Sequence, residues 1–102
     1  MEIQQLLREG REIWGEQKLT VDQVIVRLGK CFGDICRWQR NELGDRDIHT
    51  DAELKKELGN ILFSTIRWCD DLGYNPEECI QLAKEAQRKY KSKLIAHSES
   101  QK

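Results

Sequence analysis

The fold is decided by residues 50–73, which read TDAELKKELGNILFSTIRWCDDLG. Apolar side chains recur there at intervals of three and four, which is the period of an α-helix with one buried face. Thr50 and Glu53 form a capping-box pattern at its start. Phe63 and Trp68 widen the apolar stripe to a second face, so this helix is expected to pack against more than one partner. The stripe itself consists of Leu54, Leu58, Ile61, Leu62, Ile66 and Cys69.

A second long helix is expected before this one, from Thr20 to about Arg40. Another capping box, made by Thr20 and Gln23, marks its start. Its apolar stripe consists of Val21, Val24, Ile25, Leu28, Phe32 and Ile35. The polar residues 41–49 are expected to form the loop between the two long helices, which therefore pack antiparallel.

Two further helices complete the predicted fold. The first covers residues 3–17, and the last is announced by Asn-Pro-Glu-Glu at 75–78, an N-cap followed by proline and acids in the first turn. No alternating strand pattern occurs. The sequence predicts an all-α bundle of four helices with two long antiparallel central helices. It forms one domain over residues 1–96, followed by a flexible tail at 97–102.

The composition excludes several classes of function. The chain has 102 residues with 17 basic and 18 acidic side chains, and this balance argues against a nucleic-acid binder or a protein that binds membrane surfaces. No segment is apolar enough to span a bilayer and no signal peptide is recognisable, so a cytoplasmic protein is expected. No Cys-x-x-Cys pair occurs, which indicates free thiols and not a zinc site. The four cysteines are Cys31, Cys36, Cys69 and Cys79.

Polar residues flank the apolar stripes of both long helices. Glu57 and Asn60 are three residues apart and share one face, and Cys31 and Asp34 have the same spacing on the preceding helix. Paired carboxylates at this spacing on facing helices would form a cage for Mg²⁺, whose preferred ligands are oxygens, and the ion would hold a triphosphate.

Three runs resemble the MazG-like nucleoside triphosphate pyrophosphohydrolases. Residues 27–35 (RLGKCFGDI) are similar to the first motif, normally Glu-x-x-Glu, and residues 57–63 (ELGNILF) to the second, normally Glu-x-x-Asp. Residues 71–78 (DLGYNPEE) resemble the family's turn into its last core helix, and the similarity spans residues 3–93. The resemblance implies the all-α NTP pyrophosphatase fold, assembled as a homodimer or tetramer with its nucleotide pocket near the subunit interface. It also implies magnesium-dependent hydrolysis of a nucleoside triphosphate to a monophosphate and pyrophosphate.

The resemblance assigns catalysis and metal binding to Asp34 and Glu57, with Asn60 as an assisting ligand and Cys31 at a degenerate position. Two of the four expected acids are replaced, which should weaken Mg²⁺ binding by several kcal/mol. We therefore expect weak or lost activity. The alternatives are a degenerate relative that acts as a nucleotide-binding or protein-interaction module, or a purely structural helical adaptor. An acid outside the motifs, such as Glu53 or Asp71, is a possible substitute ligand.

Candidate substrate-binding residues are Trp38, Lys30, Arg88, Lys89 and Lys91. A tryptophan near the site would stack a nucleobase, although core or interface packing is the alternative. The basic side chains of the last helix would meet phosphates, or simply face solvent near the negative helix end. Glu42 and Asp45 also spell Glu-x-x-Asp, but they lie in the predicted loop and are more consistent with a chance match.

Overall fold

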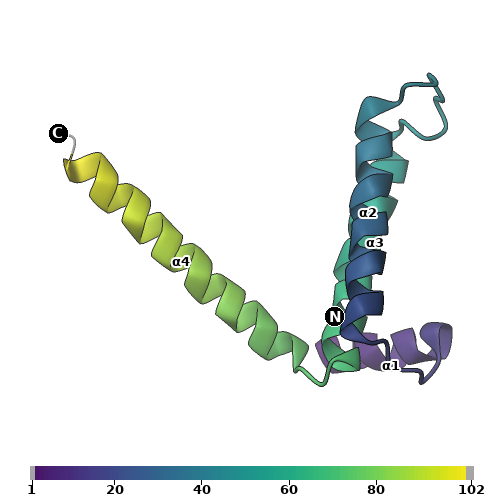
Figure 1. Cartoon of the computed structure of the whole chain (residues 1–102), viewed down its shortest axis with the longest axis horizontal. Helices are drawn as coiled ribbons and strands as arrows, with labels where there is room; N and C mark the ends of the chain where they lie inside the picture. Colours follow the sequence, from purple (N-terminus) through teal and green to yellow (C-terminus); the bar gives the residue numbers. More distant parts are fainter. Residues whose placement is uncertain (1, 101–102) are drawn as a thin grey trace.

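The structure is a computed structural model that describes residues 2–100 of the chain. It contains four helices and, within the described range, no strand, so the predicted all-α class and helix number are confirmed (Figure 1). The helices are α1 (Ile3–Trp14), α2 (Val21–Arg40), α3 (Asp51–Asp71) and α4 (Pro76–Ser100). None of these helices has the combination of length and apolar character needed to cross a membrane.

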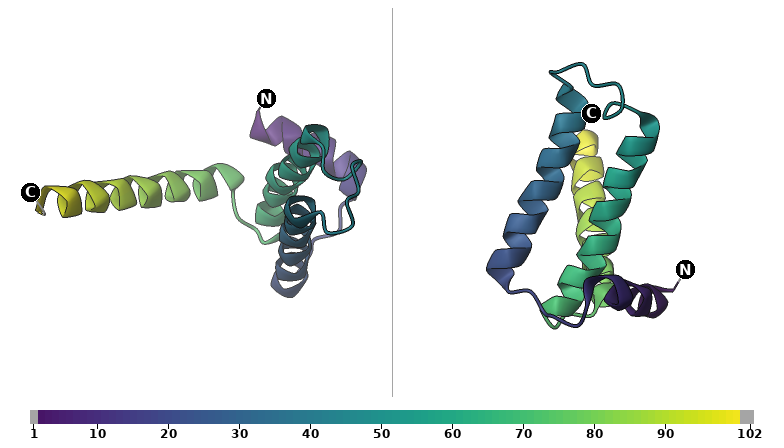
Figure 2. Two further views of the ribbon diagram at one scale, coloured as in Figure 1. Left: turned by 90° about the horizontal axis from the view of Figure 1, so that it is seen from above. Right: turned by 90° about the vertical axis from the view of Figure 1, so that its right-hand side faces the viewer.

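The helices form an open V and not a closed bundle within one chain. The helices α2 and α3 lie side by side and antiparallel, and α1 crosses the base of this hairpin (Figures 1 and 2). The helix α4 starts at the same base and diverges from the hairpin, so its far end is remote from the other helices (Figure 1). The radius of gyration is 17.6 Å, whereas a compact chain of this length has about 13 Å.

Side-chain caps set the starts of the two central helices. The Thr20 hydroxyl accepts a hydrogen bond from the Gln23 backbone N–H at 3.3 Å, and the Gln23 side chain accepts one from the Thr20 N–H at 2.9 Å. The predicted capping box of α2 is therefore complete. At α3, Thr50 accepts from the Glu53 N–H at 3.1 Å, but the Glu53 carboxylate pairs with Lys56. Glu53 thus points along its own helix, which leaves it next to the site described below.

The turn between α3 and α4 follows the predicted pattern. Gly73 has φ 80°, a left-handed conformation that glycine adopts without strain. The Asn75 side chain accepts a hydrogen bond from the Glu77 backbone N–H at 2.9 Å, and Pro76 occupies the first helical position. These contacts end one helix and begin the next within four residues.

Two helix ends differ from the prediction. α1 ends at Trp14 and not at residue 17, because Gly15 adopts φ 84° and leaves the helical path. α4 continues to Ser100, past the domain boundary predicted at residue 96. No glycine or proline follows Pro76, and the segment is rich in good helix formers. The last two residues of the predicted tail lie outside the described residues.

The core of the single chain is small. Leu19, Val24 and Trp68 form a buried cluster at the base of the hairpin. Other members of the predicted stripes are exposed, including Leu62 at 71% and Ile25 at 60%. Periodicity identified these positions as apolar, but the chain alone does not cover them.

A network of ion pairs fastens α1 to the end of α3. The Arg11 Nη2 atom lies 2.6 Å from a carboxylate oxygen of both Asp70 and Asp71. Arg67 Nε lies 3.2 Å from the other oxygen of Asp71, whose side chain is fully buried. The guanidinium groups of Arg11 and Arg67 both lie over the Trp14 ring, at 5.7 and 5.6 Å from its centroid. This end of the hairpin is therefore the most tightly connected part of the molecule.

The outer acid of this network also carries a second cation. Lys18 Nζ lies 2.8 Å from Asp70, and hydrogen bonds from Lys18 and Arg11 lower the pKa of this carboxyl. Asp70 is therefore held in its charged form, although a third of its side chain is exposed.

Candidate functional site

A polar cleft lies between α2 and α3 near the loop that joins them. Its volume is about 210 Å³. Asp34 comes from α2 and Glu57 from α3, so the antiparallel hairpin brings the two predicted acids to one cleft. The lining residues are Asp34, Arg37, Trp38, Ile48, Glu53, Lys56 and Glu57.

The acids of this cleft have lysine neighbours. Lys56 pairs with Glu53, and its Nζ atom lies 3.8 Å from Glu57 Oε1. Lys30 Nζ lies 3.7 Å from Asp34 Oδ2. The hydrogen bond to Glu53 raises the pKa of Lys56, so its ammonium group stays charged near neutral pH. The lysines are mostly exposed, so these pairs are weak and exchangeable.

The half-buried Trp38 closes the loop end of the cleft. Its ring stacks on His49 with a centroid distance of 4.6 Å and an interplanar angle of 19°. The indole N–H donates to the Thr50 carbonyl at 2.9 Å, and His49 Nδ1 lies 2.7 Å from the Trp38 carbonyl oxygen. These contacts attach the loop to both helices. His49 covers one face of the Trp38 ring, so a ligand could stack only on the other face.

The other member of each predicted pair, Cys31 beside Asp34 and Asn60 beside Glu57, does not line the cleft. Cys31 packs against the buried core cluster, and Asn60 is exposed. Each lies about one helical turn from its acidic partner, Asp34 or Glu57, toward the base of the hairpin. In the described part of the chain, no three His, Cys, Asp or Glu side chains converge on a possible metal position. The residues present therefore do not fit the magnesium cage that the resemblance implies.

The two acids considered as substitute ligands have different surroundings. Asp71 is buried at the opposite end of the hairpin in ion pairs with Arg11 and Arg67, so it is not available to the cleft. Glu53 does line the cleft. Arg37 also lines it and was not among the predicted site residues. Its spacing of three from Asp34, which places both on one helix face, is the signal that would have found it.

The basic residues predicted on the last helix lie elsewhere. Arg88, Lys89 and Lys91 are exposed on α4, which diverges from the hairpin (Figure 1). The structure of one chain does not bring them to the cleft. Lys30 is also highly exposed and approaches the site only through its ion pair with Asp34.

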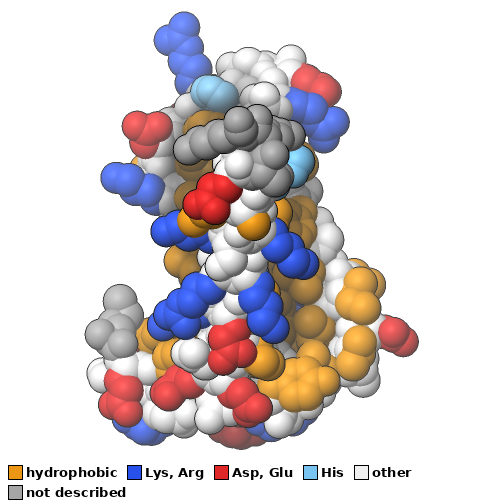
Figure 3. Space-filling view, turned by 90° about the vertical axis from the view of Figure 1, so that its left-hand side faces the viewer, with side chains coloured by type: hydrophobic (Ala, Val, Ile, Leu, Met, Phe, Trp, Pro, Cys, Tyr) orange, Lys and Arg blue, Asp and Glu red, His pale blue; other side chains and the backbone are white. Residues whose placement is uncertain are grey.

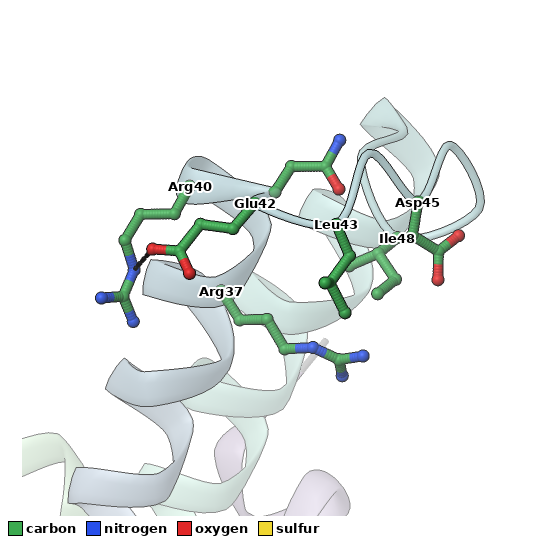
Figure 4. Close-up of a pocket in the computed structure, with 7 residues that line it drawn as sticks. Arg37, Arg40, Glu42, Leu43, Asp45 and Ile48 are labelled. Carbon is green, nitrogen blue, oxygen red and sulfur yellow. Dashed lines mark ion pairs between the residues drawn. The ribbon is translucent and has the colours of Figure 1, made fainter.

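The alternative Glu-x-x-Asp motif lines a separate pocket of about 200 Å³ at the loop (Figure 4). Glu42 turns toward Arg40, with Arg40 Nε 3.9 Å from Glu42 Oε1. Asp45 lies on the far side of Leu43 from this pair (Figure 4). The two acids therefore do not act as a pair, and the guanidinium groups of Arg37 and Arg40 make the pocket unsuitable for a cation.

Comparison of the chain with protein-family models, curated proteins and solved structures finds no match. The fold and the cleft therefore define its class by themselves: an all-α protein with a mixed-charge cleft between two antiparallel helices.

Proposed function

We propose that this chain is a degenerate relative of the MazG-like pyrophosphohydrolases, which binds a nucleoside triphosphate at the α2–α3 cleft and hydrolyses it weakly or not at all. The observation that supports this proposal is the position of Asp34 and Glu57, which lie on facing helices and line one polar cleft. Weak hydrolysis is expected because Cys31 and Asn60 stand at positions where the resembled family has acids. Neither residue lines the cleft.

Two cationic side chains of the cleft supply phosphate recognition. The Arg37 guanidinium presents paired N–H donors that match phosphate oxygens, and the Lys56 ammonium supplies a mobile charge. A bound phosphate would compete with Glu53 for Lys56, which is possible because that surface ion pair is weak. The carboxylates of Asp34 and Glu57 would accept hydrogen bonds from sugar hydroxyls or a base.

The cleft is too small for a whole nucleotide. Its volume of about 210 Å³ is below the range of roughly 300–1,000 Å³ that is usual for small-molecule sites. One chain would therefore hold the phosphates, and a second copy would complete the pocket.

Nucleotide binding predicts a rise in melting temperature when nucleoside triphosphates are added. Binding to the folded state alone stabilises it by RT ln(1 + [L]/Kd), about 2.7 kcal/mol at a ligand concentration 100 times Kd. Arg37→Ala and Lys56→Ala should abolish the rise, because they remove the phosphate donors. Matched controls are Arg27→Ala and Lys55→Ala, exposed residues of the same helices that do not line the cleft. The proposal fails if no nucleotide raises the melting temperature, or if the controls lose the response equally.

Pyrophosphate release measured with Mg²⁺ separates binding from catalysis. We expect release close to the buffer rate for the wild type and a higher rate for the Cys31→Glu, Asn60→Asp double variant, which restores two acids beside Asp34 and Glu57. Fast release by the wild type, lost in Glu57→Gln, would instead establish an active hydrolase. Absent release from a folded double variant that still binds nucleotide would remove the support for catalysis on this scaffold.

We further propose that the chain assembles with a second copy of itself. Its accessible surface is 8168 Å², whereas a compact monomer of 12.0 kDa exposes about 6,000 Å². The excess of about 2,200 Å² per chain exceeds the roughly 800 Å² that each partner buries in a standard interface and is typical of an obligate homodimer. Hydrophobic side chains lie exposed beside α4, whose own surface carries basic side chains (Figure 3).

The apolar groove between α3 and α4 is the candidate interface. Its volume is about 340 Å³, and the walls are formed by the facing sides of the two helices. The lining residues are Ile61, Leu62, Thr65, Ile66, Cys69, Pro76, Cys79, Ile80 and Ala83. A helix from a second copy would cover this groove and complete the four-helix arrangement that one chain leaves open.

The expected result in light scattering after size exclusion is a mass of at least two chains. Leu62→Glu should shift the protein toward monomer, because it places a charge in the apolar groove. Leu43→Glu is the matched control, since Leu43 is 91% exposed and lies in the loop outside the groove. A wild-type protein that is monomeric at high micromolar concentration would contradict the assembly.

A further inference from the structure

Two cysteines meet where α3 turns into α4. Cys69 lies in the last turn of α3 and Cys79 in the first turn of α4. The Cys79 side chain is near enough to Cys69 to contribute, after burial, to the raised pKa of the Cys69 thiol. Both side chains are half-buried and line the apolar groove between the two helices.

Backbone hydrogen bonds of the corner fix the positions of both cysteines. The Tyr74 N–H donates to the Cys69 carbonyl at 2.9 Å, and the Gly73 N–H donates to the Asp70 carbonyl at 3.0 Å. The Cys79 N–H donates to the Asn75 carbonyl at 3.1 Å. Each cysteine is therefore hydrogen-bonded to the turn itself, so the approach of the two thiols is part of the local fold.

The other two cysteines lack this arrangement. Cys31 and Cys36 are five residues apart on α2, a separation that places side chains on different sides of a helix. Cys31 packs against the core, and Cys36 is exposed. They therefore serve as internal controls.

We propose that Cys69 and Cys79 are an oxidisable dithiol, a modification site that reacts with a small-molecule disulfide such as oxidised glutathione to form a disulfide between α3 and α4. This proposal is independent of nucleotide binding, and it concerns the chain before a second copy covers the groove, because the two thiols line that groove.

The reaction proceeds by two thiol–disulfide exchanges. Burial and the contact with Cys79 raise the pKa of Cys69 to about 11, so Cys69 remains a thiol at neutral pH. The thiolate of Cys79 attacks one sulfur of the small disulfide, forms a mixed disulfide and releases one small thiolate. Cys69 then gives up its proton to that thiolate and attacks the Cys79 sulfur, which releases the second small thiolate. Two protein thiols are oxidised, and one small disulfide is reduced to two thiols.

The new bond would fix the base of α4 against α3. The two helices are otherwise joined by the short turn at residues 72–75 and the apolar contacts of the groove. Oxidation would therefore set the angle between the groove walls, which otherwise depends on these contacts alone.

The test is oxidation of the folded 102-residue chain at low protein concentration, where the groove stays open, with excess oxidised glutathione, followed by alkylation of free thiols and mass spectrometry. No lysine or arginine lies between Arg67 and Lys84, so trypsin releases both cysteines in one peptide of residues 68–84. We expect this peptide to lose two hydrogen atoms and to escape alkylation. After a second cleavage at Glu77 or Glu78, its two pieces should stay joined until a reductant is added.

The variants distinguish the proposed pair from general thiol reactivity. Cys69→Ser and Cys79→Ser should each abolish the intramolecular loss of two hydrogens, whereas Cys31→Ser and Cys36→Ser should leave it unchanged. Oxidation should also raise the melting temperature of the wild type and not that of Cys79→Ser, because a cross-link restricts the unfolded chain. The proposal is overturned if the oxidised protein carries only glutathione adducts or disulfides between chains, or if its melting temperature does not rise.

Discussion

Replacing Trp68 with alanine is expected to destabilise the chain by about 3–5 kcal/mol. Trp68 is 5% exposed and is the largest member of the buried cluster with Leu19 and Val24. Its removal leaves a cavity that this small core cannot refill. Since domains of this size are stabilised by only about 5–15 kcal/mol, much of the stability would be lost. Urea unfolding followed by circular dichroism measures the effect.

Two matched variants make the Trp68 result interpretable. Trp68→Phe keeps most of the apolar volume and should cost clearly less than the alanine variant. Leu43→Ala, at a residue that is 91% exposed, should change the unfolding free energy by less than about 0.5 kcal/mol. If Trp68→Ala unfolds at the wild-type urea concentration, the core is not where the structure places it.

Asp71→Asn is expected to cost roughly 2–4 kcal/mol, the second-largest effect. The substitution keeps the size of the side chain but removes its charge. The Asp71 side chain is fully buried, and the side chains of its partners Arg11 and Arg67 are 10% and 11% exposed. Removing the anion leaves the poorly solvated guanidinium group of Arg67 without its Asp71 partner and leaves Arg11 with Asp70 alone. The free energy of unfolding from urea titration should fall, with little change in m, since the exposed surface stays similar.

The control for Asp71 is its neighbour in sequence. Asp70 pairs with Arg11 and Lys18, but its side chain is 33% exposed, so water replaces the lost contact. Asp70→Asn should therefore cost about 1 kcal/mol or less. Equal effects of the two variants would show that burial does not set the strength of this network. Limited proteolysis adds a second measurement, because α1 should become cleavable earlier in Asp71→Asn than in Asp70→Asn.

The helices were predictable because their signals are local. The capping residues Thr20, Thr50 and Asn75 each mark a helix start in the structure. Periodicity also placed the apolar positions correctly, but it carries no information on which chain covers them. The divergence of α4 and the exposure of Leu62 were therefore beyond the reach of the sequence.

The candidate site was predictable in part for the same reason. The antiparallel pairing of two helices was enough to bring Asp34 and Glu57 to one cleft. The direction of Lys56 depends on its side-chain rotamer, which spacing does not specify. The partner of Asp71 lies 60 residues away in the chain, and no local pattern links Arg11 to it. Only the three-dimensional structure shows the long-range ion pairs and shows that Asn60 lies outside the cleft.

Because α4 diverges from the hairpin, a small change in the angle at the corner between α3 and α4 produces a large displacement at the far end of α4. The helix has 25 residues, so at 1.5 Å per residue it is about 37 Å long. A tilt of about 10° near Gly73 would move its far end by about 6 Å, whereas atoms beside the hinge would move by less than about 1 Å. A probe attached near the carboxyl terminus would therefore detect changes at the helix corner that are too small to observe where they arise.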